Sequence, residues 1–282
     1  IQLVRLRAET LLFQTFGERI KTISADAKMN VVQADNDSLK TEYAKMAYEK
    51  KKPDDAATLD DYVKKKDTVY PGTLYGFAYK SQNTVYVQKN DTEDNQVITL
   101  VHEMLHMNAA GDWQSTVMTD IDEGTTELLT KKACANLKGT KQAYGAQMGV
   151  VDKLISVVGE GTLVEAYFNG AGILVNALDT TIGPGTFQKL INRITDPGVF
   201  GTFEEKIGKL LDPKAATWLK QKIEEMQGLL GGWVSDEDIE KIRAIRSTIE
   251  QSDMTAVREA LYPLINSLWS DRQKSMMIEI MS

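Results

Sequence analysis

The sequence is poor in residues that cross-link a chain or carry it through a membrane. Among 282 residues there is one cysteine, Cys134, so no disulfide can form within the chain and packing must stabilise the fold. No apolar run approaches the roughly 18 residues that a membrane-spanning helix needs. The chain starts without an initiator methionine or a signal-like apolar segment, as a fragment of a longer protein would, and nothing in it assigns a compartment.

Positive charge is also in short supply. Lysine and arginine number 33 against 40 acidic residues, which gives a net charge of −7 and a pI near 5.1. A chain of this charge is not expected to bind nucleic acid or an anionic membrane as its main partner. With 42% hydrophobic residues it can nevertheless bury a large core, in one large domain or two small ones.

Segments rich in β-branched and aromatic residues fade after residue 140, which predicts a mixed α/β first half and an all-helical second half. Strands are expected at 28–35, 73–79 and 84–89, the last two as an antiparallel hairpin. Helices are expected where apolar residues recur with a 3.6-residue period: at 1–27, from Asp37 or Ser38 to Pro53, at 95–110, at 122–137 with Gly139 as C-cap, and as a series of short helices from 149 to 281.

The only two histidines lie in one segment, VHEMLHMNAA (101–110), of an expected helix. Positions i and i+4 lie on one helix face, so His102 and His106 can offer their imidazoles to one metal ion. Glu103 is rotated by about 100° and stands beside such an ion, where a general base takes a proton from metal-bound water. Chance gives this arrangement on the order of 1 time in 2,000, which favours a metal site over histidines used for packing.

A catalytic metal site needs a third protein ligand, and no further histidine or second cysteine remains to supply it. The segment DIDEGTTELLT (120–130) places Glu123 and Glu127 at i and i+4 on another expected helix. One carboxylate can bind the metal while the other hydrogen-bonds the free ring nitrogen of a ligand histidine. The alternative is a solvated, acidic helix start. Zn²⁺ suits two nitrogen ligands and one oxygen ligand, with the fourth position open to water.

This pattern, His102-Glu103-x-x-His106 followed by Glu123-Gly124-x-x-Glu127, resembles the motif of the gluzincins, the thermolysin-like branch of the zincin metallopeptidases. The resemblance implies that Glu123 is the third zinc ligand and that Glu127 orients a histidine. The gap of 16 residues between His106 and Glu123 is shorter than in thermolysin itself, so the connecting loop must differ.

A nearer similarity, over about residues 28–200, is to predicted bacterial metallopeptidases in which an EG-x-TE helix precedes a tyrosine and two further segments. Here these parts read Tyr144, VVDKLISVVG and EAYFNG. Relatives of this kind often occur as cargo or toxin modules of bacterial injection and secretion systems. The similarity therefore implies a bacterial effector with a secretion- or injection-system partner.

The resemblance implies an α+β fold with a zincin-like core. We expect a metallopeptidase domain at 1–200, with an α/β upper part at about 28–110 and a helical lower part at about 111–200, and a helical C-terminal subdomain at 201–282. The implied activity is that of a zinc-dependent endopeptidase that acts on a peptide or protein substrate with Glu103 as general base.

Two further parts of the mechanism are expected from the resemblance. Thermolysin-like enzymes stabilise the oxyanion with a tyrosine and a histidine. No third histidine is present, so Tyr144 is the leading candidate, with Tyr167 and Arg193 as alternatives. In zincins a strand above the cleft pairs with the substrate backbone, a role expected here for 75–79 or 84–88.

Two other interpretations stay open. In one, the chain is a non-catalytic zinc-binding delivery or interaction module, and the helical tail with Trp218, Trp233 and Trp269 is its functional part. In the other, the zinc hydrolase cleaves a different bond, such as an amide of a cell wall. An open coordination position favours catalysis over a structural metal.

Overall fold

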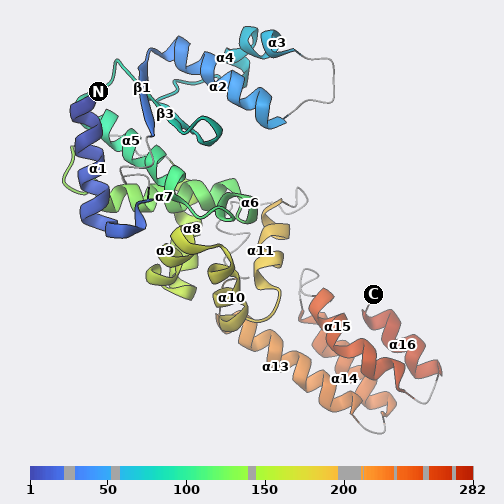
Figure 1. The fold of residues 1–282 in the computed structure, drawn as a ribbon. Helices are drawn as coiled ribbons and strands as arrows, with labels where there is room; N and C mark the ends of the chain where they lie inside the picture. The colour runs from blue at the N-terminus through green and yellow to red at the C-terminus, as the bar shows by residue number, and fades with distance from the viewer. Residues whose placement is uncertain are drawn as a thin grey trace.

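The computed structural model describes residues 1–21, 29–51, 58–138, 144–195, 211, 213–231, 234–249, 254–268 and 271–281. These residues are mostly helical, with one small sheet near the N-terminus (Figure 1). The predicted α+β class is compatible with this composition of elements.

Three strands form a mixed sheet in the order β1-β3-β2. The central strand β3 (Thr84–Gln88) runs parallel to β1 (Asn30–Ala34) and antiparallel to β2 (Gly76–Tyr79). The turn between β2 and β3 is a short 3-10 helix, η3 (Lys80–Gln82), and then Asn83, whose left-handed conformation (φ 47°) asparagine tolerates well. The predicted strand at 28–35 and the hairpin are confirmed.

The two faces of the sheet pack into different cores because side chains alternate along a strand. Val85 and Val87 enter the main core, whereas Tyr86 enters a smaller one with Phe77 and with residues of helix α2 (Asn36–Lys51). The rings of Phe77 and Tyr86 stack with centroids 4.7 Å apart. Two short helices, α3 (Leu59–Lys64) and α4 (Lys66–Val69), precede β2.

The main core is built around helix α5 (Glu93–Asn108), which carries both histidines. The predicted apolar stripe of this helix, from Val97 to Leu105, is fully buried. Helices α1 (Gln2–Phe16) and α7 (Thr119–Ala133) pack against it. The same core continues through α6 (Trp113–Thr116), α8 (Gly145–Val158), α9 (Glu160–Asn169), α10 (Gly172–Thr181) and α11 (Thr186–Thr195).

The last four helices have a core of their own. They are α13 (Pro213–Leu230), α14 (Asp236–Ser247), α15 (Met254–Asn266) and α16 (Asp271–Met281), and Figure 1 shows them gathered at the C-terminal end. Trp218 is 38% exposed on α13, and Trp233 and Trp269 lie outside the described residues. The expected domain boundary near residue 200 also lies outside them, so it stays a prediction.

Several expected helix ends were wrong. Helix α1 ends at Phe16 rather than near 27, because Gly17 takes up a left-handed conformation (φ 59°), and 22–28 lie outside the described residues. The cap of α2 is Asp35, whose carboxylate accepts the Ser38 N–H at 2.8 Å, and not Asp37 or Ser38.

The helix expected at 122–137 also has different ends. It starts three residues earlier, at Thr119, and ends at Ala133, while Gly139 lies outside the described residues. Glu123 and Glu127 both lie inside α7, so the expected i, i+4 relation holds.

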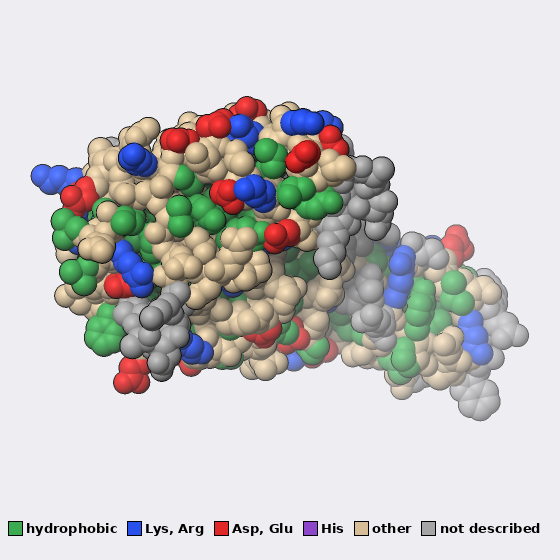
Figure 2. Space-filling model, turned by 45° about the horizontal axis from the view of Figure 1, so that its top comes forward, with side chains coloured by type: hydrophobic (Ala, Val, Ile, Leu, Met, Phe, Trp, Pro, Cys, Tyr) green, Lys and Arg blue, Asp and Glu red, His purple; other side chains and the backbone are tan. Residues whose placement is uncertain are grey.

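The surface mixes charges of both signs. On the face that Figure 2 presents, acidic and basic side chains are interspersed among hydrophobic and neutral ones, and no histidine is visible there. Among the described helices, none combines the length and apolar character needed to cross a membrane.

Gly124 allows α7 and α8 to approach closely. A Cβ at this position would lie 2.5 Å from the carbonyl oxygen of Gln147 and 2.8 Å from its carbon, so the backbone of α8 would have to move. The start of α8 carries Tyr144 immediately before it, so this contact positions that tyrosine. The glycine of the EG segment therefore has a packing role.

We predict that Gly124→Ala lowers the free energy of unfolding by about 1–3 kcal/mol, because the added methyl group meets backbone rather than a flexible side chain. Urea denaturation measures the change. Gly161→Ala on α9 is the matched control, since a Cβ there meets nothing within 4 Å and alanine favours the helix. Equal stability of the Gly124→Ala variant and the wild type would contradict the packing role.

Candidate metal centre

Helix α5 places its two histidine rings against each other in the core. His102 and His106 lie one turn apart and are only 7% and 6% exposed. Their rings meet edge to face with centroids 4.9 Å apart, and the two Nε2 atoms are separated by 3.2 Å. Both imidazoles therefore turn the same nitrogen toward one point.

Helix α7 brings a carboxylate to the same point. Oε2 of Glu123 lies 3.2 Å from Nε2 of His102 and 3.4 Å from Nε2 of His106. Three potential ligand atoms from two helices thus form a nearly equilateral triangle. This buried His-His-Glu cluster could bind a metal ion.

The pKa values of the cluster residues are shifted because their charged groups are buried close to one another. Burial alone would raise the pKa of Glu123, but hydrogen bonds from His102 and His106 outweigh burial and hold it well below its usual range. Burial alone would lower the pKa of His106, but the carboxylates of Asp122 and Glu123 raise it to about 10. A cation that binds at this site must therefore compete with protons for the imidazole nitrogens.

Asp122 fixes the orientation of His106, a role that the sequence analysis missed. Its Oδ2 lies 3.3 Å from Nδ1 of His106 and accepts a hydrogen bond from Gln114 Nε2 at 3.0 Å. Its Oδ1 accepts the indole N–H of Trp113 at 3.0 Å. A carboxylate at Nδ1 favours the proton on that nitrogen, which leaves the lone pair of Nε2 free for a metal.

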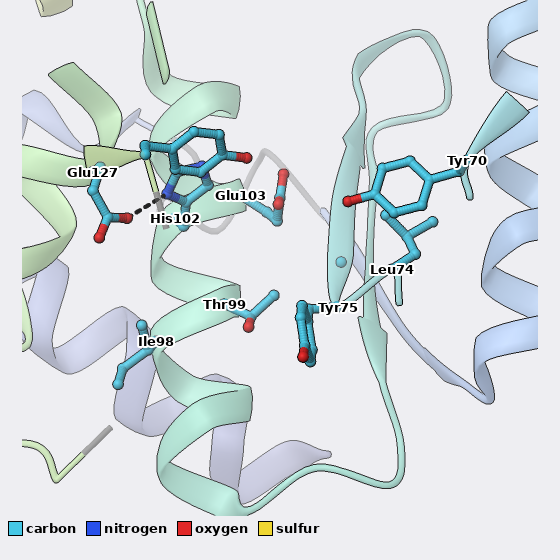
Figure 3. A pocket seen from close by; sticks show the side chains of 10 residues that line it. Tyr70, Leu74, Tyr75, Ile98, Thr99, His102, Glu103 and Glu127 are labelled. Carbon is cyan, nitrogen blue, oxygen red and sulfur yellow. Dashed lines mark ion pairs between the residues drawn. The ribbon is translucent and has the colours of Figure 1, made fainter. Parts of the chain in front are cut away.

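Glu127 lies beside His102, where the sequence analysis placed an orienting carboxylate. Its Oε2 is 3.6 Å from Nδ1 of His102, an ion-pair distance longer than a hydrogen bond (Figure 3). The hydroxyl of Thr130 lies nearer to the same nitrogen, at 3.4 Å. Lys131 is 3.7 Å from the other carboxylate oxygen of Glu127.

Glu103 stands beside the triangle and not in it. The side chain is half-buried between α5 and β2 (Figure 3). Its carboxylate accepts a hydrogen bond from the backbone N–H of Ala78. Burial raises the pKa of this carboxyl above its ordinary value. This is the position that a general base beside a bound metal would occupy.

Gly76 lets β2 lie this close to α5. A Cβ at this position would come within 2.5 Å of Thr99 Cγ2 and 2.7 Å of the Tyr86 carbonyl oxygen, and 3.5 Å from Glu103 Cγ. Any larger residue would force the strand away from the helix. Gly76, in the segment YGFAY, is therefore the residue from which the cleft could have been predicted. Motif spacing alone did not identify it.

The strand β2 is an edge of the sheet, so one side of its backbone faces the cleft. The N–H of Gln88 donates to the carbonyl of Tyr75 at 2.7 Å. Because bonded and non-bonded pairs alternate in an antiparallel ladder, Phe77 points its backbone groups toward β3, whereas Gly76 and Ala78 point theirs away from it. Of the two expected substrate-pairing segments, 84–88 is the central strand, and 75–79 contains the strand at the edge of the described sheet.

Tyr144 covers the cluster from the start of α8. Its ring stacks on that of His102 with centroids 5.5 Å apart and an interplanar angle of 7°, and its hydroxyl hydrogen-bonds to Glu123. Burial, followed by the nearby carboxylates of Glu123 and Glu103, raises its pKa. The backbone of Tyr144 is left-handed (φ 64°), which non-glycine residues seldom adopt outside functional or strained sites.

The two alternative oxyanion candidates are placed differently. Tyr167 is fully buried, and its hydroxyl lies 2.9 Å from that of Thr126, which in turn lies 3.4 Å from Nδ1 of His106. It therefore supports a histidine from within the core. The side chain of Arg193 lies outside the described residues.

Comparisons of this chain with protein-family models, with curated proteins and with solved structures gave no match. The geometry of the cluster is therefore the basis for any statement about its function.

We predict that Asp122→Asn weakens metal binding about 10- to 100-fold, as is typical when a group that orients a ligand histidine is lost. An amide N–H facing Nδ1 of His106 would favour the tautomer with the proton on Nε2, which cannot bind a metal. Competition with a chromophoric chelator, with Zn²⁺ as the probe, measures the affinity. Asp152→Asn, at an exposed position of α8, is the control. Unchanged affinity of Asp122→Asn would rule out the orienting role.

Proposed function

We propose that the protein is a zinc-dependent endopeptidase whose zinc site is formed by His102, His106 and Glu123. The observation that carries this proposal is the triangle of ligand atoms, with sides of 3.2, 3.2 and 3.4 Å. Tetrahedral zinc with ligand bonds of about 2.0–2.1 Å separates its ligand atoms by about 3.3–3.4 Å. Two imidazoles and one carboxylate are also a donor set that suits zinc.

The number of ligands supports a catalytic site over a structural one. Within the described residues the cluster has three ligand groups, and structural zinc sites are closed by a fourth. Bound there, zinc would supply a Lewis acid for the scissile carbonyl and would acidify water.

Glu103 is the proposed general base. From its place between α5 and β2 it takes a proton from the attacking water and passes that proton to the leaving amine as the peptide bond breaks. In the metal-free site, burial raises the pKa of this carboxyl above its ordinary value. The backbone N–H of Ala78 donates a hydrogen bond to the same carboxylate.

A peptide is the substrate class that the edge of β2 favours. The N–H and C=O groups of Gly76, which point away from β3, can pair with an extended backbone as an added strand would. A chain bound in this way runs past Glu103 and the cluster. The hydroxyl of Tyr144, within hydrogen-bonding distance of Glu123, donates to the oxyanion that forms on the scissile carbonyl.

The gluzincin resemblance stays part of this proposal, and with it the role of a bacterial effector that a secretion or injection system delivers. The C-terminal helices are assigned a separate partner-binding role in this proposal, since the described residues of their core all lie between 219 and 281. In this interpretation the first part of the chain carries the catalysis and the last four helices are available to a partner.

We predict that Glu103→Gln keeps the metal but lowers kcat at least 100-fold, because the amide cannot accept the proton from water. His106→Ala should lose both the metal and the activity. Metal content by atomic absorption and cleavage of a peptide library report the two effects separately. Glu279→Gln on α16, an exposed position, is the matched control. A Glu103→Gln protein with wild-type activity would refute the assignment of the base.

We predict that Tyr144→Phe lowers kcat about 100- to 1,000-fold with little change in KM, the usual effect of removing one donor to an oxyanion. Phenylalanine preserves the ring stacked on His102, so metal affinity should stay near that of the wild type. Steady-state kinetics with a chromogenic peptide gives both constants. Tyr262→Phe, on an exposed ring of α15, serves as the control. An unchanged kcat would exclude the hydroxyl from the reaction.

A further inference from the structure

Helix α1 presents an apolar face to solvent, opposite the face that it buries. Leu3, Leu6 and Phe13 are 60%, 60% and 57% exposed, the largest fractions for large hydrophobic side chains among the described residues. The residues that this helix buries in the main core are Val4, Ala8, Leu12 and Phe16. Exposed apolar side chains that gather on one face, unlike scattered ones, mark a site of interaction.

The exposed side chains follow one line along the helix. Together with Thr10, which is also exposed, they form a stripe that we call the α1 seam (Leu3, Leu6, Thr10 and Phe13). Its intervals of 3, 4 and 3 residues are those of the a and d positions of a heptad repeat. Side chains with this spacing interlock with an equivalent line on a second helix. The spacing therefore indicates that a helix covers the seam.

We propose that the α1 seam is the contact between two copies of this chain, which pair through antiparallel α1 helices related by a two-fold axis. The intervals read the same in both directions. An antiparallel pair centred at Ala8 therefore sets Leu3 against Phe13 of the second copy, and it likewise sets Leu6 against Thr10. Every seam residue then meets a seam residue, which is the self-complementarity that a two-fold interface requires.

The charges beside the α1 seam are compatible with this contact. The seam contains no charged residue. On its flanks, Arg5 pairs with Glu9 at 2.7 Å, and Arg7 pairs with Asp94 of α5 at 2.8 Å. Covering the seam therefore leaves none of these charges desolvated without a partner. A strongly acidic or basic partner would find no complementary charge on the seam, which favours a second copy over such a partner.

The length of α1 predicts a weak dimer. The helix has 15 residues. A helix pair of this length buries on the order of 1,000 Å² in total, near the lower limit for a specific interface. The net charge of −7 on each copy also opposes association, although physiological salt screens it beyond about 8 Å. We therefore expect a reversible dimer whose fraction rises with protein concentration.

Sedimentation equilibrium of the full chain in physiological salt, over a wide range of concentrations, measures the dissociation constant of the dimer. Leu6→Glu should raise this constant at least about tenfold, because it buries a carboxylate from each copy. Thr10→Leu should lower it about tenfold, because an apolar side chain then lies opposite Leu6. Leu59→Glu, at an exposed leucine of α3, is the matched control and should change nothing.

A folding control accompanies these variants. Circular dichroism reports whether each one keeps the helix content of the wild type. If Leu6→Glu does not fold, Thr10→Glu repeats the test at a position that is already polar and exposed. A dimer that neither glutamate weakens would overturn the proposal.

Disulfide formation tests the antiparallel arrangement. The one native cysteine, Cys134, is buried and does not interfere. Under mild oxidation, a mixture of the Leu3→Cys and Phe13→Cys proteins should form a linked heterodimer. Neither protein alone should link to itself at a comparable rate, because the two copies of one position would lie about 15 Å apart along the helix axis. Faster linkage of each protein to itself would indicate a parallel pair and would overturn the proposal.

Other occupants of the α1 seam give different results. A wild-type protein that stays monomeric at every concentration would overturn the proposal. If that monomer also sediments with phosphatidylcholine vesicles, and Leu6→Glu abolishes this binding, the face belongs to a lipid surface rather than to a second copy.

Discussion

The distance between helices α5 and α7 is the constraint on which the site depends. Two imidazoles lie on one helix and the third ligand atom on the other, and the three atoms lie within 3.4 Å of one another only because the helices share a tightly packed core. Protein interiors transmit small changes in packing, so this triangle is sensitive to residues far from it in sequence. The packing of α8 on α7 acts in the same way, and it depends on Gly124, the residue that follows Glu123.

Polar side chains around the cluster orient its two histidine rings. Each histidine has polar groups at its Nδ1: Thr130 and Glu127 for His102, and Asp122, Gln114 and Thr126 for His106. Asp122 is in turn fixed by two further donors, so the ring of His106 is the more firmly oriented of the two. Such outer contacts set both the tautomer and the basicity of a ligand histidine.

Motif spacing predicted the parts of the site that lie on regular helices, and it missed those that depend on tertiary contacts. His102, Glu103 and His106 follow from an i, i+4 pattern, and Glu123 from a second helix with a glutamate pair. Asp122 was not identified because its partners come from α6, a short helix that no periodicity predicts.

The same distinction holds for the fold. The hairpin and the apolar stripe of α5 were predicted because their side-chain patterns are local. The end of α1 was not, since Gly17 stops the helix through one backbone conformation that composition does not report. Which edge of the sheet faces the cleft could not be read from sequence either, because strand order is a property of the assembled sheet.

The hydrogen bond between Ala78 and Glu103 links β2, the strand proposed to pair with a substrate, to the proposed base. Any displacement of β2, whether by an incoming chain or by a change in the loop before it, acts on the carboxylate without an intermediary. In the proposed mechanism, recognition of a peptide backbone by β2 and proton transfer by Glu103 are therefore coupled through this hydrogen bond. A peptide that pairs poorly with β2 would leave the Glu103 carboxylate misaligned. In the proposed mechanism, peptides that bind with similar affinity would then differ in kcat.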